Sequence, residues 1–259
     1  MKESKGEQVF VEERSIVRKI WGRSDVILFI FAGAAAEFAL NKAVDWLYFT
    51  GKLPSDPLGR LFSTVGYARK IVFSSLDEAN EAIDTIQKIH SAVEKARSAK
   101  IPDWAYRDVL FMLIHYSIAS YELLREELTL EEKEEVYDVF YRVGVRMGLK
   151  ELPTGYQEWL SARDVHIDQD LQKSRYTSDL FRQYQKHLGW FRFRILIEGQ
   201  KLVVPARVKE LLGLGQVYFL LPVVYVYRFS RRLGLDKPLR NMLLPAAYKE
   251  QINRLDVNS

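Results

Sequence analysis

Residues 55–96 read SDPLGRLFSTVGYARKIVFSSLDEANEAIDTIQKIHSAVEKA, and this stretch decides the fold class. Asp56 followed by Pro57 is typical of a helix N-cap and the first helical residue. Ser75 and Glu78 have the spacing of a capping box, which would begin a second helix. After that start, apolar residues recur every three or four positions, as one face of a helix requires. The stretch therefore predicts two consecutive amphipathic helices.

The same helical signals recur along the chain. TLEE at 129–132 and TGYQ at 154–157 are further capping boxes. Residues 195–205 are a candidate for a short β-hairpin, and polar residues crowd 164–190, which looks least structured. We predict an all-α fold of about eight to eleven helices, given typical helix lengths.

The domain organisation follows from the absence of repeats, low-complexity runs and obvious linkers. We predict one globular multi-helix domain over residues 1–259, with 1–13 as a flexible N-terminal segment. The net charge of +4 is spread over 259 residues, so no nucleic-acid partner is expected. The sequence contains no cysteine, which excludes disulfides, thiolate zinc sites, iron–sulfur clusters and covalently attached haem. The N-terminus lacks the apolar core of a secretory signal, which favours a cytoplasmic protein.

Two apolar segments could suggest a membrane protein. Residues 26–40 include Glu37, and residues 217–229 include Pro222. Both are shorter than the run of about 20 residues that a membrane-spanning helix needs, so we expect two buried core helices. The second segment is followed by arginines, so peripheral contact with an anionic membrane surface stays open.

His90 continues the apolar face of the second helix, in line with Ile83 and Ile86. Its imidazole is therefore expected to face inward. One interpretation is a core histidine hydrogen-bonded to a backbone carbonyl. The other is an axial ligand, because neutral imidazole is a common ligand of haem iron.

Two further polar residues lie on apolar helical faces. His115 has Phe111 and Ile118 as helical neighbours, and it either supports a pocket or is core. Glu37 shares a face with Ile30 and Leu40. A carboxylate there must be paired or have a raised pKa, unless it reaches water at the edge of the face.

The sequence RDVHIDQD at 163–170 groups His166 with three aspartates. Binding of a hard metal ion is conceivable there. We favour a solvated polar segment, because loops are commonly built from such residues. No zinc-protease motif, phosphate-binding loop or nucleophile elbow is present.

Seven segments, taken in order, resemble one known family. They are DPLGRLFST, VFSSLDEA, IQKIHSAVEKA, AYRDVLFMLIHYSIASYE, LTLEEKEEVYDVFYRVGVRMGL, LPTGYQEWL and LPVVYVYRFSRRLGL. Their order and spacing resemble the superfamily of latex-clearing proteins (rubber oxygenases) and MpaB-type oxygenases, from about residue 14 to about residue 250. The resemblance implies a globin-like helical core around a non-covalent haem b.

The resemblance also implies roles for particular residues. His90 matches the axial ligand of the iron, and Arg60 and Thr64 match an Arg and a Thr one helical turn apart in the haem pocket. Arg60 would pair with a haem propionate. His115 is a second-rank candidate for cofactor binding. Glu37 and Asp45 are the candidates for an upstream acid or base.

The sequence departs from the rubber-cleaving pattern at Ser63, where that pattern has a Lys. The rubber-cleaving members of the family are exported, whereas this sequence shows no export signal, so rubber itself is a poor substrate. A smaller isoprenoid or lipid-like molecule suits a cytoplasmic protein better. The leading hypothesis is a haem-dependent oxygenase that uses O₂ on this apolar substrate. The alternative is a non-catalytic helical protein that binds haem or a lipid, at a membrane surface or free of it.

Overall fold

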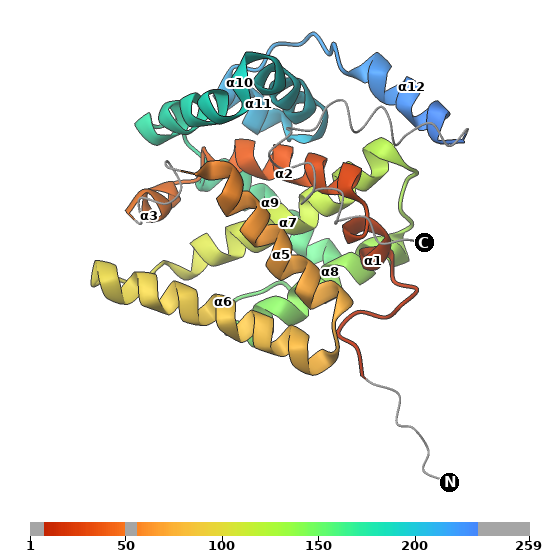
Figure 1. Cartoon of the computed structure of the whole chain (residues 1–259). Coiled ribbons are helices and arrows are strands. Elements are labelled where there is room, and N and C mark those ends of the chain that lie inside the picture. The colour runs from red at the N-terminus through yellow and green to blue at the C-terminus, as the bar shows by residue number, and fades with distance from the viewer. Residues whose placement is uncertain (1–7, 50–55, 233–259) are drawn as a thin grey trace.

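A computed structural model describes residues 8–49 and 56–232, and these residues form an all-α fold (Figure 1). Their helices are α1 (Ile16–Trp21), α2 (Ser24–Phe38), α3 (Val44–Phe49), α5 (Pro57–Phe73), α6 (Leu76–Arg97), α7 (Asp103–Leu124), α8 (Leu130–Arg146), α9 (Tyr156–Gln169), α10 (Arg175–Val203), α11 (Ala206–Leu212) and α12 (Leu221–Arg232). The predicted fold class is confirmed. The globin-like arrangement stays a prediction.

The helix starts that define residues 55–96 are confirmed. The Asp56 side chain caps α5 by accepting a hydrogen bond from the Gly59 amide at 2.8 Å. Ser75 caps α6 through the Glu78 amide. The predicted capping box at 129–132 is also present, with both of its reciprocal hydrogen bonds. At 154–157 the expected box does not form; Gly155 is the N-cap there, without a side-chain cap.

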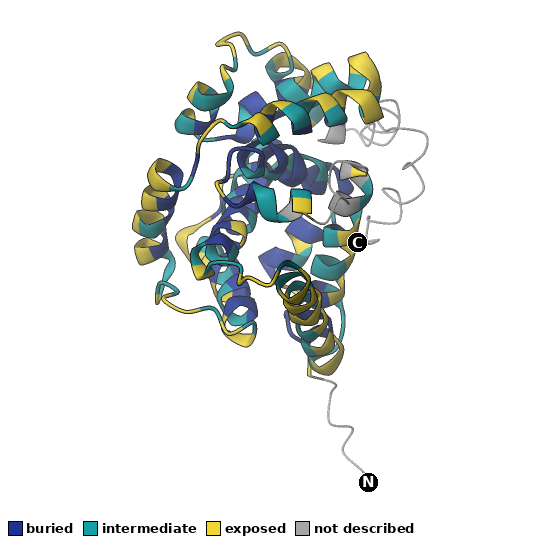
Figure 2. Cartoon of the chain, turned by 90° about the vertical axis from the view of Figure 1, so that its left-hand side faces the viewer, coloured by how far each residue is buried: buried dark blue, intermediate teal, exposed yellow. Residues whose placement is uncertain are grey.

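Helices α2 and α7 form the centre of the core. They pack against each other more extensively than any other pair of helices in the described part of the chain. Figure 2 shows the buried residues concentrated in the middle of the bundle, with exposed residues on the outer helix faces. The segment 26–40 is thus a buried helix, as its length predicts. Helices α2 and α7 approach each other closely at Gly33 of α2, which faces the ring of Tyr116 on α7.

The expectations for residues 164–205 are wrong. Residues 164–169 complete α9, and 175–203 form α10, so the hairpin expected at 195–205 is absent. The polar residues misled the interpretation because they lie on the outer faces of amphipathic helices. Thr177, Leu180 and Tyr184 face the core at helical spacing. Helix α10 is kinked at Gly189, whose φ of 72° is in the left-handed region.

The second apolar segment is also not a core helix. Only Val224 among the apolar side chains of α12 is buried, whereas Tyr225, Val226 and Phe229 are each more than 60% exposed. Among the described residues, no helix is both long enough and apolar enough to cross a membrane. Residues 8–13, part of the segment expected to be flexible, include Phe10 and Val11 in the buried core.

Gly33→Ala is expected to destabilise the fold, because its Cβ would lie 2.2–2.9 Å from three ring carbons of Tyr116. That ring is fully buried, and its hydroxyl is hydrogen-bonded. Overpacking of this kind costs about 1–3 kcal/mol. Gly66→Ala in α5 is the matched control, because nothing lies within 4 Å of its Cβ. The control should gain up to about 1 kcal/mol. Urea unfolding measures both, and equal stabilities would contradict the packing.

Candidate functional site

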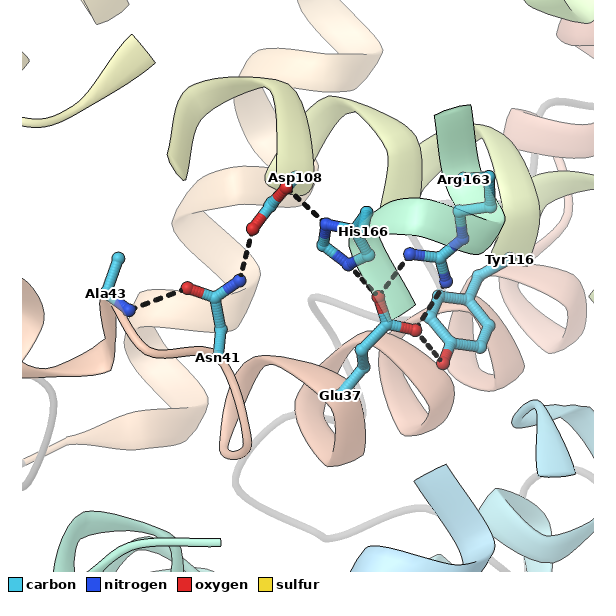
Figure 3. A network of polar contacts seen from close by, with 7 residues as sticks. All are labelled: Glu37, Asn41, Ala43, Asp108, Tyr116, Arg163 and His166. Carbon is cyan, nitrogen blue, oxygen red and sulfur yellow. Dashed lines mark hydrogen bonds and ion pairs between the residues drawn. The ribbon is translucent and has the colours of Figure 1, made fainter. Parts of the chain in front are cut away.

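A buried ion pair joins α2 to α9. The two oxygens of the Glu37 carboxylate each accept a hydrogen bond from the Arg163 guanidinium, both at 2.5 Å. Tyr116 of α7 donates its hydroxyl to the same carboxylate at 2.7 Å. All three side chains are buried, and Glu37 is completely inaccessible to solvent. The interaction therefore connects the three helices in the interior (Figure 3).

His166 extends this ion pair into a network. Its Nε2 lies 2.9 Å from a Glu37 oxygen, and its Nδ1 contacts Asp108. The other Asp108 oxygen accepts a hydrogen bond from the Asn41 side chain at 2.7 Å. Helical spacing explains the convergence. Arg163 and His166 are three residues apart on α9, so they share one face.

The charges within the network determine its protonation. Burial opposes ionisation of Glu37, but the positive charges and hydrogen bonds of Arg163 and His166 outweigh it and hold the pKa of Glu37 well below its usual value. Burial also disfavours a charged His166. Its contacts with Asp108 and Glu37 prevail and raise its pKa. Burial raises the pKa of Tyr116. Glu37 is therefore an ionised hydrogen-bond acceptor, and the geometry gives it no free lone pair directed at a substrate.

Asp170 completes a second group around His166. It is the C-cap of α9, and its carboxylate is half-buried. One ligand-type atom each from Asp108, His166 and Asp170 lie within 4.8 Å of one another. Segment 163–170 was expected to be solvated, so its contribution of Arg163 and His166 to the buried network corrects that interpretation.

The two carboxylates proposed as acid or base have different partners. Glu37 belongs to the buried network. Asp45 lies on α3, where it accepts a hydrogen bond from Arg97 of α6 at 2.7 Å. The Asp45 side chain is about one-third exposed, and the Arg97 guanidinium also covers the Trp46 ring. The structure thus places the two candidates in separate environments.

The haem candidates His90, Arg60 and Thr64 lie on α5 and α6, which contribute no residue to the buried network. His90 is half-buried, with its ring against Tyr106 at 5.1 Å between centroids. It lines a cavity of about 200 Å³ that is rimmed by charged side chains such as Glu94 and Lys100. Thr64 is half-buried on α5. The side chain of Arg60 lies outside the described part of the structure.

His115 lies next to Tyr116 on α7. Its Nε2 is buried and has no hydrogen-bond partner among the described residues. Burial and the nearby Arg163 charge lower the pKa of His115 to about 4. The imidazole is therefore neutral near pH 7. The Val203 backbone lies near the ring, while Nε2 makes no hydrogen bond of regular geometry. Such a nitrogen has the chemistry of a metal ligand.

A haem needs an iron ligand and a cavity of sufficient size, and the two histidines differ in these features. At His115 the neutral, buried imidazole is a chemically suitable iron ligand. The cavity beside His90 is smaller than the roughly 300–1,000 Å³ typical of ligand sites, and its rim is charged. The cavity at His90 as it stands therefore does not accommodate a haem.

Sequence reasoning missed Arg163, Asp108, Asn41 and Tyr116 as parts of the site. The only signal was indirect: a carboxylate at Glu37 on an apolar face must have a partner. Its partner Arg163 is 126 positions away in the sequence. A single sequence does not indicate which distant cation fulfils that need.

The described helices define the chain as an all-α protein with a buried ionic network at its centre. The family described as "ER-bound oxygenase mpaB/B'/Rubber oxygenase, catalytic domain" matches residues 18–248, and the chain belongs to this family. No curated protein and no solved structure matches the chain. The resemblance stated from the seven sequence segments is thereby confirmed.

Glu37→Gln is expected to lower the free energy of unfolding by about 3–5 kcal/mol, because it leaves Arg163 as a buried charge without its partner. Glu151→Gln is the matched control. Glu151 also pairs with an arginine, Arg107, but its side chain is 80% exposed. Screening by solvent makes that pair weak, so the control should unfold like the wild type. Similar losses in both variants, measured by urea unfolding, would contradict the role of the buried pair.

Proposed function

We propose that the protein is a haem b-dependent oxygenase that oxidises or cleaves an apolar, isoprenoid or lipid-like substrate with O₂. Membership of the oxygenase family over residues 18–248 supports the reaction class. The observation that carries the haem proposal is the buried, neutral imidazole of His115 on the central helix α7, whose Nε2 makes no hydrogen bond of regular geometry. Bound haem iron would supply O₂ binding and activation.

Two histidines are available to hold the iron. The family resemblance favours His90, and the neutral, buried imidazole of His115 is the second candidate. Use of His90 requires its surroundings to open beyond the 200 Å³ cavity, which implies movement between α6 and its neighbours. Arg60 and Thr64 would line the same pocket, with Arg60 pairing with a propionate.

The reaction also needs a group that moves a proton. Of the two candidates, Glu37 is held by Arg163, Tyr116 and His166, so it suits positioning of α2 against α7 and α9. Asp45 is partly exposed and held by one arginine, so a substrate could reach it. We therefore propose Asp45 as the better candidate for the acid or base. Ser63 is exposed and supplies no positive charge, which separates this protein from the rubber-cleaving pattern.

The variants His90→Ala and His115→Ala identify which histidine binds the haem iron. Haem added to the purified wild type should give a Soret band, and the variant that loses the iron ligand should lose or shift that band. His187→Ala is the control, because His187 is exposed on α10. Absorption titration measures all four proteins. A wild type without a Soret band, or two variants that bind haem like the control, would overturn the haem proposal.

A second candidate function, contact with a membrane surface, rests on α12. Tyr227 of this helix is fixed to Asp25 at 2.6 Å, and Arg228 donates to the Arg125 carbonyl at 2.5 Å. Four apolar side chains of α12 are nevertheless at least half exposed, which are Val223, Tyr225, Val226 and Phe229. An exposed apolar helical face next to arginines suits peripheral binding to anionic lipid.

Val226→Asp should weaken co-flotation with vesicles that contain anionic lipid, because it places a negative charge on the exposed face of α12. Val145→Asp makes the same change on α8, where Val145 is 52% exposed, and should leave flotation unchanged. If the wild type does not float with anionic vesicles, or if both variants lose binding equally, the proposed contact of α12 with the membrane is wrong.

A further inference from the structure

The group formed by Asp108, His166 and Asp170 is a set of ligands from two helices. Asp108 lies on α7, His166 lies on α9, and Asp170 caps the C-terminal end of α9. Donor atoms of the three lie within 4.8 Å of one another. One imidazole and two carboxylates are a common donor set for divalent transition metals.

The surroundings of this group fix the orientation of two ligands. His166 Nε2 faces Glu37 at 2.9 Å, which leaves Nδ1 directed at Asp108. The Asp108 oxygen that does not face His166 accepts a hydrogen bond from Asn41. Histidine ligands of metals usually donate their second nitrogen to a carboxylate, and their carboxylate neighbours are themselves hydrogen-bonded. Figure 3 shows these supporting contacts around His166.

The atoms that face the centre of the group are less well satisfied. His166 Nδ1 is buried and makes no hydrogen bond of regular geometry, although it contacts Asp108. The Asp170 carboxylate makes no hydrogen bond among the described residues. The residues around the group therefore have hydrogen-bond partners. No single partner contacts the donor atoms of Asp108, His166 and Asp170 together.

The charges around His166 also favour the binding of a cation. Three carboxylates, Glu37, Asp108 and Asp170, surround His166, and Arg163 is the buried arginine that faces them. Lys42 and Arg107 approach Asp170 from neighbouring segments, but the Lys42 ammonium is exposed and bonded to the Gln169 carbonyl. With a neutral His166, the two positive charges of a divalent ion and the one positive charge of Arg163 would balance the negative charges of the three carboxylates.

We propose that Asp108, His166 and Asp170 bind a divalent transition-metal ion, of the Mn²⁺, Fe²⁺ or Zn²⁺ type. The half-buried Asp170 gives the ion a path from solvent. The site shares no ligand with His90 or His115, so it does not depend on the haem proposal. Its role is to hold the C-terminal end of α9 against α7, next to the Glu37–Arg163 pair.

The test uses the full-length, haem-free protein after treatment with EDTA. Mn²⁺ is titrated and followed by electron paramagnetic resonance, and thermal unfolding is measured with and without the ion. The wild type should bind one Mn²⁺ per chain and unfold at a higher temperature when Mn²⁺ is present. Asp170→Asn should weaken binding by at least about tenfold, in the range that altered metal sites show.

Asp168→Asn is the matched control. It makes the same change two residues earlier on α9, at an exposed position, and should bind Mn²⁺ like the wild type. Absence of stoichiometric binding by the wild type would overturn the proposal by itself. Equal binding by the two variants would also overturn it, because the ion would then lie elsewhere. Neither result affects the haem titration, so the two proposals fail independently.

Discussion

The ion pair between Glu37 and Arg163 is the constraint on which the interior depends. Burying either charged side chain without the other would be very costly. Exposing either side chain at the surface would require α2 and α9 to move apart. Tyr116 and His166 satisfy the remaining hydrogen-bonding capacity of the carboxylate. The pair therefore selects one relative placement of α2, α7 and α9 among the many that apolar packing alone would allow.

The environment of this pair separates structural and chemical roles in the protein. Glu37 is ionised and fully engaged, so its strength as an acceptor stabilises the fold and leaves little capacity for proton transfer. Other polar groups are less fully engaged: His115 Nε2 makes no hydrogen bond of regular geometry, Asp45 is partly exposed, and the Asp170 carboxylate is half-buried. His115, His166 and Asp108 lie on α7 and α9, which the buried pair joins to α2, whereas Asp45 lies on α3.

Local signals in the sequence predicted the fold well. The caps at Asp56, Ser75 and Thr129 depend on neighbouring residues, so they are visible in one sequence. Predictions failed where long-range packing decides. His90 continues an apolar face, yet it is half-buried, because the buried residues of α6 lie in its N-terminal half and the helix continues along the edge of the bundle (Figure 1). The candidate site was harder still, since Arg163 and His166 look like surface residues until their partners on α2 and α7 are known.

A double-mutant cycle on Glu37 and Arg163 tests the central claim most directly. The free energy of unfolding is measured for the wild type, Glu37→Gln, Arg163→Met and the double variant. If the buried pair constrains the interior, the double variant should be much more stable than the sum of the two single losses implies, with a coupling energy of at least about 2 kcal/mol. Losses that add within about 0.5 kcal/mol would show that the two side chains act independently, and would contradict the account.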